Sequence, residues 1–512
     1  MLERFLGKGI HDRIQITLLT VLAIALTFSK ALMSISIMLL LLNLLLEGSF
    51  KTYFERIKRN RIILILLLFF TIQLLSVAWS EFVMEGFKDI KTKLPILLLP
   101  VVLVSKPVSR KGIQIIFGGF LMAVLFVSVY NFIAYQGWIG NRIYDDIRGM
   151  SLFSSHVRFA LLISMATAIL LIHDWGYRNE WFIRIPLIIW FVFYTYYSQV
   201  LTGALTLGSI LVLSSFFVLH KQKKWLGIGF LAGTTICLIM ALIWIFRPIS
   251  YNLDEYQNLP IKTAEGNLYY HAPKEVLPET GEPIEIMICW PEIEREWPKV
   301  SKIPYDSKDL KGQNISSTLV RYMASKGLNK DAEGFSKLTS EDIRNIEKGH
   351  ASIYYSGILA RAYGLQYQLN NDLDPNGHSL LERLEYWRHG MLIIKSPSFF
   401  AGVGVGDVQS EFNRVYQEHN TQLEEANWHR AHNMFLTTLI GIGIIGLFIF
   451  IWLHSEFILK MIRSKNTLAL LFMIITLVSY MTEDTLETQT GVTFFSLFFA
   501  MFISRVVKAS KN

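Results

Sequence analysis

The sequence predicts an all-α polytopic membrane protein, with about twelve transmembrane helices and one large, mainly helical segment between spans 9 and 10. Hydrophobic residues make up 52% of the 512 residues and charged residues only 18%, which is more apolar than a soluble protein of this size. The apolar residues come in blocks of about 17 to 22, enough to cross roughly 30 Å of hydrocarbon as a helix. Helices are favoured because an open strand would leave backbone groups unpaired in lipid, and the alternation of a closed barrel is missing.

Nine apolar blocks precede the large segment and three follow it. The first nine lie near 14–29, 31–47, 62–79, 94–105, 113–135, 157–173, 182–197, 199–219 and 226–246, and the last three near 434–455, 467–481 and 489–507. The fourth block is short and contains Pro95 and Pro100, whose rings remove backbone donors from a helix. We therefore expect a bent or partly inserted helix there, with eleven spans as the alternative count.

The distribution of Lys and Arg predicts the orientation in the membrane, because short cytoplasmic loops are enriched in these residues. With the N-terminus inside, the basic clusters fall in the cytoplasm. They include Arg56, Lys58, Arg59 and Arg61 after the second span, Lys221, Lys223 and Lys224 after the eighth, and Arg505, Lys508 and Lys511 at the C-terminus. An even number of spans also places both termini in the cytoplasm, so the two signals agree.

The segment 247–433 is therefore expected on the periplasmic side. This divides the chain into spans 1–9 (residues 1–246), the periplasmic segment (247–433), and spans 10–12 with a cytoplasmic C-terminus (434–512). The segment holds 20 basic and 26 acidic residues, although the whole chain has a formal net charge of +8. The positive excess thus lies on the cytoplasmic rim, facing anionic membrane lipid. This distribution excludes a nucleic-acid-binding surface, and no Cys/His cluster has the spacing of a zinc site.

The periplasmic segment is too long and too patterned to be a linker. Its first part, Tyr251 to Trp297, is rich in Pro, Glu and aromatic residues and indicates short strands or extended loop. Three helices are predicted after it: one that places Leu319, Tyr322 and Met323 on one face, one that starts at Thr339-Ser340-Glu341-Asp342, and one from His378 to Lys395. Cys289 lies in this segment and Cys237 in a span, so we expect no disulfide between them.

Candidate catalytic residues gather where this segment meets the tenth span. His429, Arg430, His432 and Asn433 lie there. Histidine exchanges a proton near neutral pH, so a histidine at the membrane boundary can act as a general base. The alternative is an interfacial histidine that only hydrogen-bonds at a helix start, and the residues alone favour this alternative.

Candidate anion-binding residues precede this cluster. Arg383 and Trp387 lie four residues apart on one face of a predicted helix, with Arg388 beside them, and guanidinium groups suit phosphate. The alternative is a solvated helix face on which the arginines pair with Glu382 and Glu385, and the residues alone favour it.

A glycine run, Gly402-Val403-Gly404-Val405-Gly406, follows Ser396-Pro397, which ends the helix. Its backbone N–H groups could hold an anion, but it lacks the lysine of a P-loop. We interpret Gly404 and Gly406 as parts of a tight turn that orients the flanking helices.

Two further groups lie at the same boundary. His156 and Arg158 are at the outer mouth of the sixth span, where Arg158 either binds a lipid phosphate or extends to the headgroups. Glu483, Asp484 and Glu487 occupy the short outer turn between the last two spans, either as a solvated turn or as carboxylates that orient His432 or a cation.

Four sequence features occur in a recognisable order. Trp79-Ser80-Glu81 follows the third span, and Arg383-x-x-x-Trp387 precedes the glycine run. His432-Asn433 is followed, after nine residues, by Gly443-Ile444-Ile445-Gly446, and the last outer turn reads Thr482-Glu483-Asp484-Thr485-Leu486-Glu487-Thr488-Gln489-Thr490-Gly491. Together with the span count and the large outer segment, this order resembles the bacterial O-antigen ligase and polymerase superfamily, especially members from the Bacteroidetes.

The resemblance implies a glycosyltransferase that moves a glycan from undecaprenyl diphosphate to the lipid A–core of lipopolysaccharide, outside the cytoplasmic membrane. It implies neither metal nor nucleotide cofactor, because the donor carries its own diphosphate leaving group. By resemblance, His432 is the catalytic residue and takes the proton of the acceptor hydroxyl, while Arg383, Arg388 or Arg158 holds the diphosphate. The supporting residues would be His156, His429, Asn433, Gly404, Gly406, Glu483 and Asp484.

One stretch departs from the superfamily pattern. Many members carry a Ser-Arg-Thr-Gly-like sequence at the start of the eighth span, whereas this chain has Gln199-Val200-Leu201-Thr202-Gly203, with Leu201 in place of the arginine. Another arginine is therefore expected to supply that charge, or the donor is held differently.

Other functions remain open at this point. A polysaccharide polymerase or a protein O-oligosaccharyltransferase of the same superfamily is the alternative, because these enzymes share the donor and differ in the acceptor. A transporter of lipid-linked glycans is the third hypothesis. It is disfavoured because transporters usually show internal repeats and ionisable groups at mid-membrane, and the hydropathy pattern contains no repeat.

Overall fold

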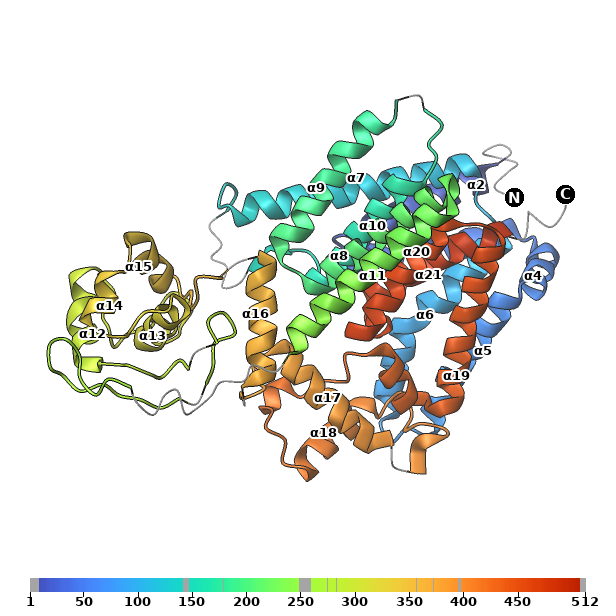
Figure 1. Cartoon of the computed structure of the whole chain (residues 1–512). Helices are drawn as coiled ribbons and strands as arrows, with labels where there is room; N and C mark the ends of the chain where they lie inside the picture. Colours follow the sequence, from blue (N-terminus) through green and yellow to red (C-terminus); the bar gives the residue numbers. More distant parts are fainter. Residues whose placement is uncertain are drawn as a thin grey trace. The chain divides into compact units, whose positions relative to one another are not determined.

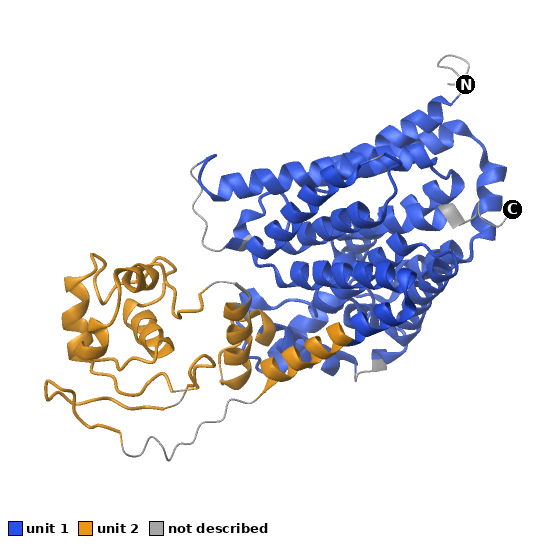
Figure 2. Cartoon of the chain, turned by 45° about the horizontal axis from the view of Figure 1, so that its top comes forward, with its two compact units in different colours: residues 1–232, 382–512 blue, residues 233–381 orange. Residues whose placement is uncertain are grey.

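The computed structural model describes residues 9–140, 147–177, 179–247, 259–273, 275–281, 283–355, 357–371, 373–394 and 397–506. Within these ranges the regular structure is helical, with isolated β-bridges and no β-strand, which confirms the all-α prediction (Figure 1). The chain divides into two compact units, Met1–Ala232 with Glu382–Asn512, and Gly233–Leu381 (Figure 2).

Helices lie at all twelve positions predicted from the apolar blocks. They are α2 (Ile10–Ala25), α3 (Lys30–Glu47), α5 (Arg61–Ser76), α6 (Val83–Ser105), α7 (Arg110–Tyr135), α8 (His156–Ile172), α9 (Trp181–Ser198), α10 (Leu201–Gln222), α11 (Lys224–Phe246), α19 (Met434–Arg463), α20 (Thr467–Thr482) and α21 (Gln489–Val506). Six of the helices described, α3, α5 with the turn after it, α7, α10, α11 and α19, are long and apolar enough to cross a membrane. Twelve crossings therefore remain a prediction.

The fourth block is longer than the sequence suggested. Helix α6 begins at Val83 rather than near residue 94, and it continues through both prolines to Ser105. Its first turns carry charged residues, among them Asp89 and Lys93, which hydropathy assigns to water. Lys93 forms ion pairs with Asp89 and with Glu487, so these charges are accommodated inside the protein and the helix continues through them.

A short helix that hydropathy did not predict, α4 (Phe50–Arg59), lies between α3 and α5. Its Phe50 and Phe54 side chains are exposed, and its last turn carries Arg56, Lys58 and Arg59. Hydropathy missed this helix because the segment is too polar to form an apolar block, and the helix is too short to cross a bilayer.

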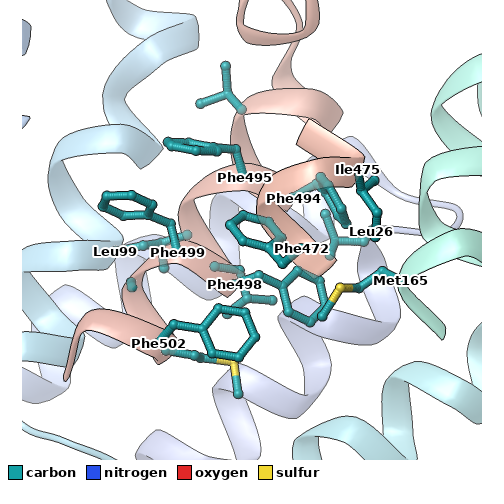
Figure 3. Packing of buried hydrophobic residues seen from close by; sticks show 14 of the residues in the cluster. Leu26, Leu99, Met165, Phe472, Ile475, Phe494, Phe495, Phe498, Phe499 and Phe502 are labelled. Atoms are coloured by element: carbon teal, nitrogen blue, oxygen red, sulfur yellow. The ribbon is translucent and has the colours of Figure 1, made fainter. Parts of the chain in front are cut away.

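Aromatic packing holds the last helices of the larger unit together. Phe472 of α20 lies among Phe494, Phe495, Phe498 and Phe502 of α21, as Figure 3 shows. Rings of this size bury large apolar areas and favour edge and offset contacts. The packing fixes α20 against α21 and therefore fixes the short turn that joins them.

The smaller unit contains α12 (Trp290–Glu296), α13 (Ile315–Ser325), α14 (Ala332–Ser336), α15 (Ser340–Glu347) and α16 (Gly357–Asn370). The predicted faces are confirmed: Leu319, Tyr322 and Met323 of α13 are buried. Helix α15 starts with the predicted capping box, in which Thr339 and Asp342 satisfy each other's backbone N–H groups.

Residues 251–258 of the stretch expected to form strands or loop lie outside the described residues, and over the rest, up to Trp297, the expectation holds only in part. Isolated bridges pair Lys262 with Leu268 and Tyr270 with Ile288, but α12 then forms. Pro291, one of the prolines that suggested a loop, lies in the first turn of α12. A proline in the first turn of a helix loses no intrahelical hydrogen bond. Both cysteines are free, as expected.

Candidate functional site

The turn between α20 and α21 carries the acidic residues around which the site is built. Asp484 is buried, and its Oδ1 accepts a hydrogen bond from the Thr437 hydroxyl at 2.7 Å. Its Oδ2 accepts one from the backbone N–H of His432 at 3.1 Å. Burial raises the pKa of Asp484, and the bond from Thr437 partly opposes this. The aspartate thus ties the turn to the start of α19.

His432 is held in an unusual backbone conformation beside this turn. Its φ is +46°, in the left-handed region that few residues other than glycine occupy. The next residue, Asn433, caps α19 by accepting hydrogen bonds from two backbone N–H groups, each at 3.1 Å. The helix start is therefore secured by Asn433, so the His432 imidazole is not needed as a cap.

The His432 side chain faces a carboxylate. Its Nδ1 lies 3.5 Å from Oε2 of Glu483, and its ring lies 5.6 Å from that of Tyr386, centroid to centroid. The side chain is 32% exposed. Other than this contact, Nδ1 has no hydrogen-bond partner among the described residues. A small movement would bring the imidazole and the carboxylate into a hydrogen bond.

Glu483 joins His432 to an arginine. Its Oε1 accepts a hydrogen bond from Nη2 of Arg383 at 3.0 Å, and Nε of Arg383 also donates to the backbone oxygen of Thr482 at 3.3 Å. Burial by itself would raise the pKa of Glu483, but His432, Arg383 and Arg158 together lower it. The carboxylate is therefore charged at neutral pH and lies between a histidine and a guanidinium group.

A second set of charges lies beside the first. Lys93 of α6 is 5% exposed, and its Nζ lies 2.7 Å from both an Asp89 oxygen and Oε1 of Glu487. Oε2 of Glu487 lies 2.9 Å from Nη1 of Arg430. Burial opposes ionisation of Glu487, but the charges of Lys93 and Arg430 outweigh it and lower the pKa of this carboxyl. Lys93 thus lies between two carboxyl groups, and Glu487 lies between two cations.

The acidic residues of the turn, together with Asp89, Arg430 and His432, line one open cleft of about 860 Å³. Arg158, at the start of α8, also lines it and donates from Nε to the Thr488 hydroxyl at 2.7 Å. Burial and the nearby His432 lower the pKa of His429. The lining residues are Glu85, Lys88, Asp89, Thr92, Arg158, Gln409, His429, Arg430, His432, Glu483, Asp484, Glu487 and Thr488.

The glycine run is a tight turn, as interpreted from the sequence, and not an anion cradle. The backbone N–H groups of residues 402–407 all donate to protein acceptors. These are the oxygens of Ser398, Ile440, Gly441 and Gly404 and the hydroxyls of Ser76 and Ser80. No donor in this run remains for a bound anion.

The turn packs backbone against backbone. A Cβ added to Gly404 would lie 2.2 Å from the Ser80 hydroxyl, so a side chain cannot fit. Asp407, directly after the run, accepts hydrogen bonds from the N–H groups of Glu81 and Phe82 at 2.7 and 2.8 Å. The turn therefore positions the start of α6, and with it the charged first turns of that helix.

Several predicted site residues lie elsewhere. Arg388 of α17 (Ser379–Ile394) is 73% exposed and contacts Glu385, which matches the solvated-face alternative. His156 lines another, smaller cavity, with Met150 and Tyr194 among its neighbours. Arg383 and Trp387 do share a face: Trp387 donates to the backbone oxygen of Ala431 at 2.9 Å and so supports the chain just before His432.

Sequence reasoning assigned no role to Lys93, whereas it placed Arg430 in the boundary cluster and Glu487 among carboxylates that could orient a cation, and the structure pairs these two. The spacing of Asp89 and Lys93, four residues apart within an apparent helix extension, was the available signal. Glu487 and Arg430 lie 57 residues apart in the sequence, and their pairing follows only from the fold.

Residues 334–451 match a family model described as O-antigen ligase. No curated protein matches the chain. The matched range contains Arg383, the glycine run and His432, so the resemblance to the O-antigen ligase superfamily is confirmed over the part of the chain that carries these residues. Together with the apolar helices, the match supports a membrane glycosyltransferase of the ligase and polymerase superfamily.

Proposed function

We propose, from the O-antigen ligase match over residues 334–451 and from the cleft around His432, that this inner-membrane protein transfers a glycan from undecaprenyl diphosphate to the lipid A–core of lipopolysaccharide at the periplasmic face. The observation that carries the proposal is the sequence of contacts Arg383–Glu483–His432 at the edge of a cleft that arginines also line. It combines a base with an anion-binding environment, the two groups that this reaction needs.

In the proposed reaction, an acceptor sugar hydroxyl attacks the anomeric carbon of the donor glycan. A carbon–oxygen bond forms there as the bond from that carbon to the diphosphate oxygen breaks, and undecaprenyl diphosphate leaves with the electron pair. His432 takes the hydroxyl proton on Nε2, and Glu483 stabilises the imidazolium through Nδ1. Arg383 is a positioning residue, because its guanidinium is bonded to Glu483 and to the Thr482 carbonyl.

Of the three arginines predicted to bind the diphosphate, Arg158 is the best placed to do so. It lines the cleft, and its hydrogen bond goes to a neutral hydroxyl rather than to a carboxylate. Arg158 also lies near Leu201, the position at which many members of the superfamily carry an arginine. Gly203 approaches Ala160 so closely that an added Cβ would be 2.7 Å from the Ala160 Cβ, which brings the starts of α8 and α10 together. Arg158 therefore compensates for Leu201.

Reconstitution tests the reaction. The purified protein in vesicles receives an undecaprenyl-diphosphate glycan with either lipid A–core or more of the same donor. We expect a glycan on lipid A–core. Chain extension without core would replace the ligase by the alternative, a polymerase, and transfer to a protein hydroxyl would indicate a protein O-oligosaccharyltransferase. Movement of intact donor across the bilayer without transfer would identify a transporter.

The role of His432 has its own test. His432→Ala removes the base but leaves the Asn433 cap of α19, so we expect normal insertion and a kcat lower by about 100- to 10,000-fold. The matched control is His419→Ala, at an exposed histidine after α18 (Val408–Glu418), which should transfer at the wild-type rate. Wild-type turnover by His432→Ala would remove this residue from the mechanism.

A further inference from the structure

Arg430 occupies a distinctive place among the cations of the cleft. Its side chain is 26% exposed and contacts Glu487 through Nη1 alone among the described residues, although a guanidinium carries five N–H donors. It lies two residues before His432 and lines the same cleft. Its guanidinium therefore has a planar pair of donors to offer to an anion in that cleft.

The carboxylate that Arg430 contacts has a second cation. Glu487 is 8% exposed, and its other oxygen lies 2.7 Å from Nζ of the buried Lys93. If Arg430 turned toward an incoming anion, Glu487 would keep its ion pair with Lys93, which it shares with Asp89. The usual penalty for stripping a partner from a buried carboxylate is thereby reduced.

In the contact between Arg383 and Glu483, the carboxylate has no lysine or second arginine within ion-pair distance among the described residues. Arg383 is bonded to Glu483 and to a backbone carbonyl, and Glu483 has His432 as its other close partner, which is cationic only when protonated. Withdrawal of Arg383 would therefore disturb the base. Among the two arginines that are paired with buried carboxylates here, Arg430 is the one that can change partner.

Arg430 also lines a second cavity. Together with Asp89 and Glu487, it lines both the cleft and a smaller cavity of about 280 Å³. Arg158 is the other arginine of the cleft, and it lies beside Thr488. Two separate cationic places suit a ligand with two phosphate groups.

We propose that Arg430 binds one phosphate of a polyprenyl diphosphate by exchanging Glu487 for it, while Lys93 keeps its ion pair with Glu487. This inference rests on the proposed function and deepens it: Arg430 is the residue by which the cleft distinguishes a diphosphate from a monophosphate. Glu487 acts as an internal competitor that occupies Arg430 when the site is empty.

Binding without turnover tests this exchange. The full chain carrying His432→Ala is purified in nanodiscs, and Kd is measured for undecaprenyl diphosphate and undecaprenyl monophosphate. Adding Arg430→Gln should raise the Kd of the diphosphate about tenfold or more, because a charge-assisted pair is lost, and should change the Kd of the monophosphate less than about threefold. The matched control is Arg388→Gln. Arg388 is exposed and, like Arg430, contacts a glutamate, which here is Glu385 of the same helix.

A second variant should act in the opposite direction. Glu487→Gln removes the internal competitor, so the diphosphate should bind more tightly than to the parent protein, a gain that structural damage would not produce. Equal Kd values for the parent and Arg430→Gln, or equal losses for both ligands, would overturn the inference and leave the proposed function intact. A parent protein that binds neither lipid would overturn both.

Discussion

The pKa values of neighbouring carboxyl groups in the α20–α21 turn shift in opposite directions because their surroundings differ. Glu483 faces Arg383 and His432, and these partners lower its pKa in spite of burial. Asp484 is bonded to a neutral hydroxyl and to a backbone N–H, and burial raises its pKa. Glu483 faces the imidazole of His432, whereas Asp484 contacts the backbone N–H of His432. At the scale of single residues, Glu483 is therefore the orienting partner of the base and Asp484 a structural link.

The role of Glu483 predicts a change in the pH profile. The pKa of Glu483 lies below its ordinary value of 4.5, so this group stays ionised as the pH falls toward that value and interacts with the base throughout the acid limb of kcat. Glu483→Gln should lower kcat by more than about tenfold. The acid limb should also move to lower pH, since the protonated imidazole has lost its carboxylate.

The pH profile separates this role from a merely structural one. Glu418→Gln, at an exposed glutamate of α18 paired with Arg414, is the control and should keep both kcat and the profile. If Glu483→Gln lowered kcat while the acid limb stayed in place, Glu483 would not be the partner of the base.

At the scale of helices, the kink of α19 and the glycine turn form one unit. The helix departs from helical geometry at Ile442 and Gly443, and the N–H groups of Val403 and Gly404 donate to the oxygens of Ile440 and Gly441 at this break. A regular helix would keep those oxygens for its own fourth-next N–H groups. The break thus supplies the acceptors that anchor the turn.

Gly443 should tolerate no side chain. Its φ of 67° and ψ of −174° lie in a region that is nearly exclusive to glycine, and an added Cβ would be 2.1 Å from the Phe400 oxygen. We expect Gly443→Ala to cost about 1–3 kcal/mol or more of stability. Thermal unfolding of the purified protein measures this cost.

The comparison variant lies in the same helix. At Gly441 the nearest atom to an added Cβ is a Val408 methyl at 3.3 Å, so Gly441→Ala should cost less than about 1 kcal/mol. Equal melting temperatures for Gly443→Ala and the wild type would show that the kink is not required for stability.

The accuracy of the sequence predictions differs between elements for physical reasons. The apolar blocks predicted the helices because hydropathy is local, and Thr339 predicted the start of α15 because a capping box spans only four residues. The start of α6 was misplaced because Asp89 and Lys93 find their partners through tertiary contacts. Likewise, His432 was identified by its place at the boundary, but its link to Arg383 through Glu483 joins segments about 50 and 100 residues apart.

At the scale of the whole molecule, the distribution of charge predicts how the chain crosses the membrane. The segment 247–433 has more acidic than basic residues, whereas the rest of the chain is strongly basic. Short loops that are rich in Lys and Arg stay on the cytoplasmic side of the membrane, so the basic α4 and the acidic segment should lie on opposite sides of the membrane. The proposed transfer depends on this, because its donor and acceptor are expected to meet outside the cytoplasm.

Single cysteines at exposed positions test that arrangement. In a background that carries Cys237→Ala and Cys289→Ala, Leu310→Cys places a thiol on a residue that is 75% exposed in the smaller unit, and Lys58→Cys places one on the exposed part of α4. A membrane-impermeant maleimide applied to intact spheroplasts should label Leu310→Cys and leave Lys58→Cys unlabelled until the membrane is opened. Labelling of Lys58→Cys in intact spheroplasts, with Leu310→Cys protected, would reverse the orientation and place the His432 cleft on the cytoplasmic side, where the proposed acceptor is not expected.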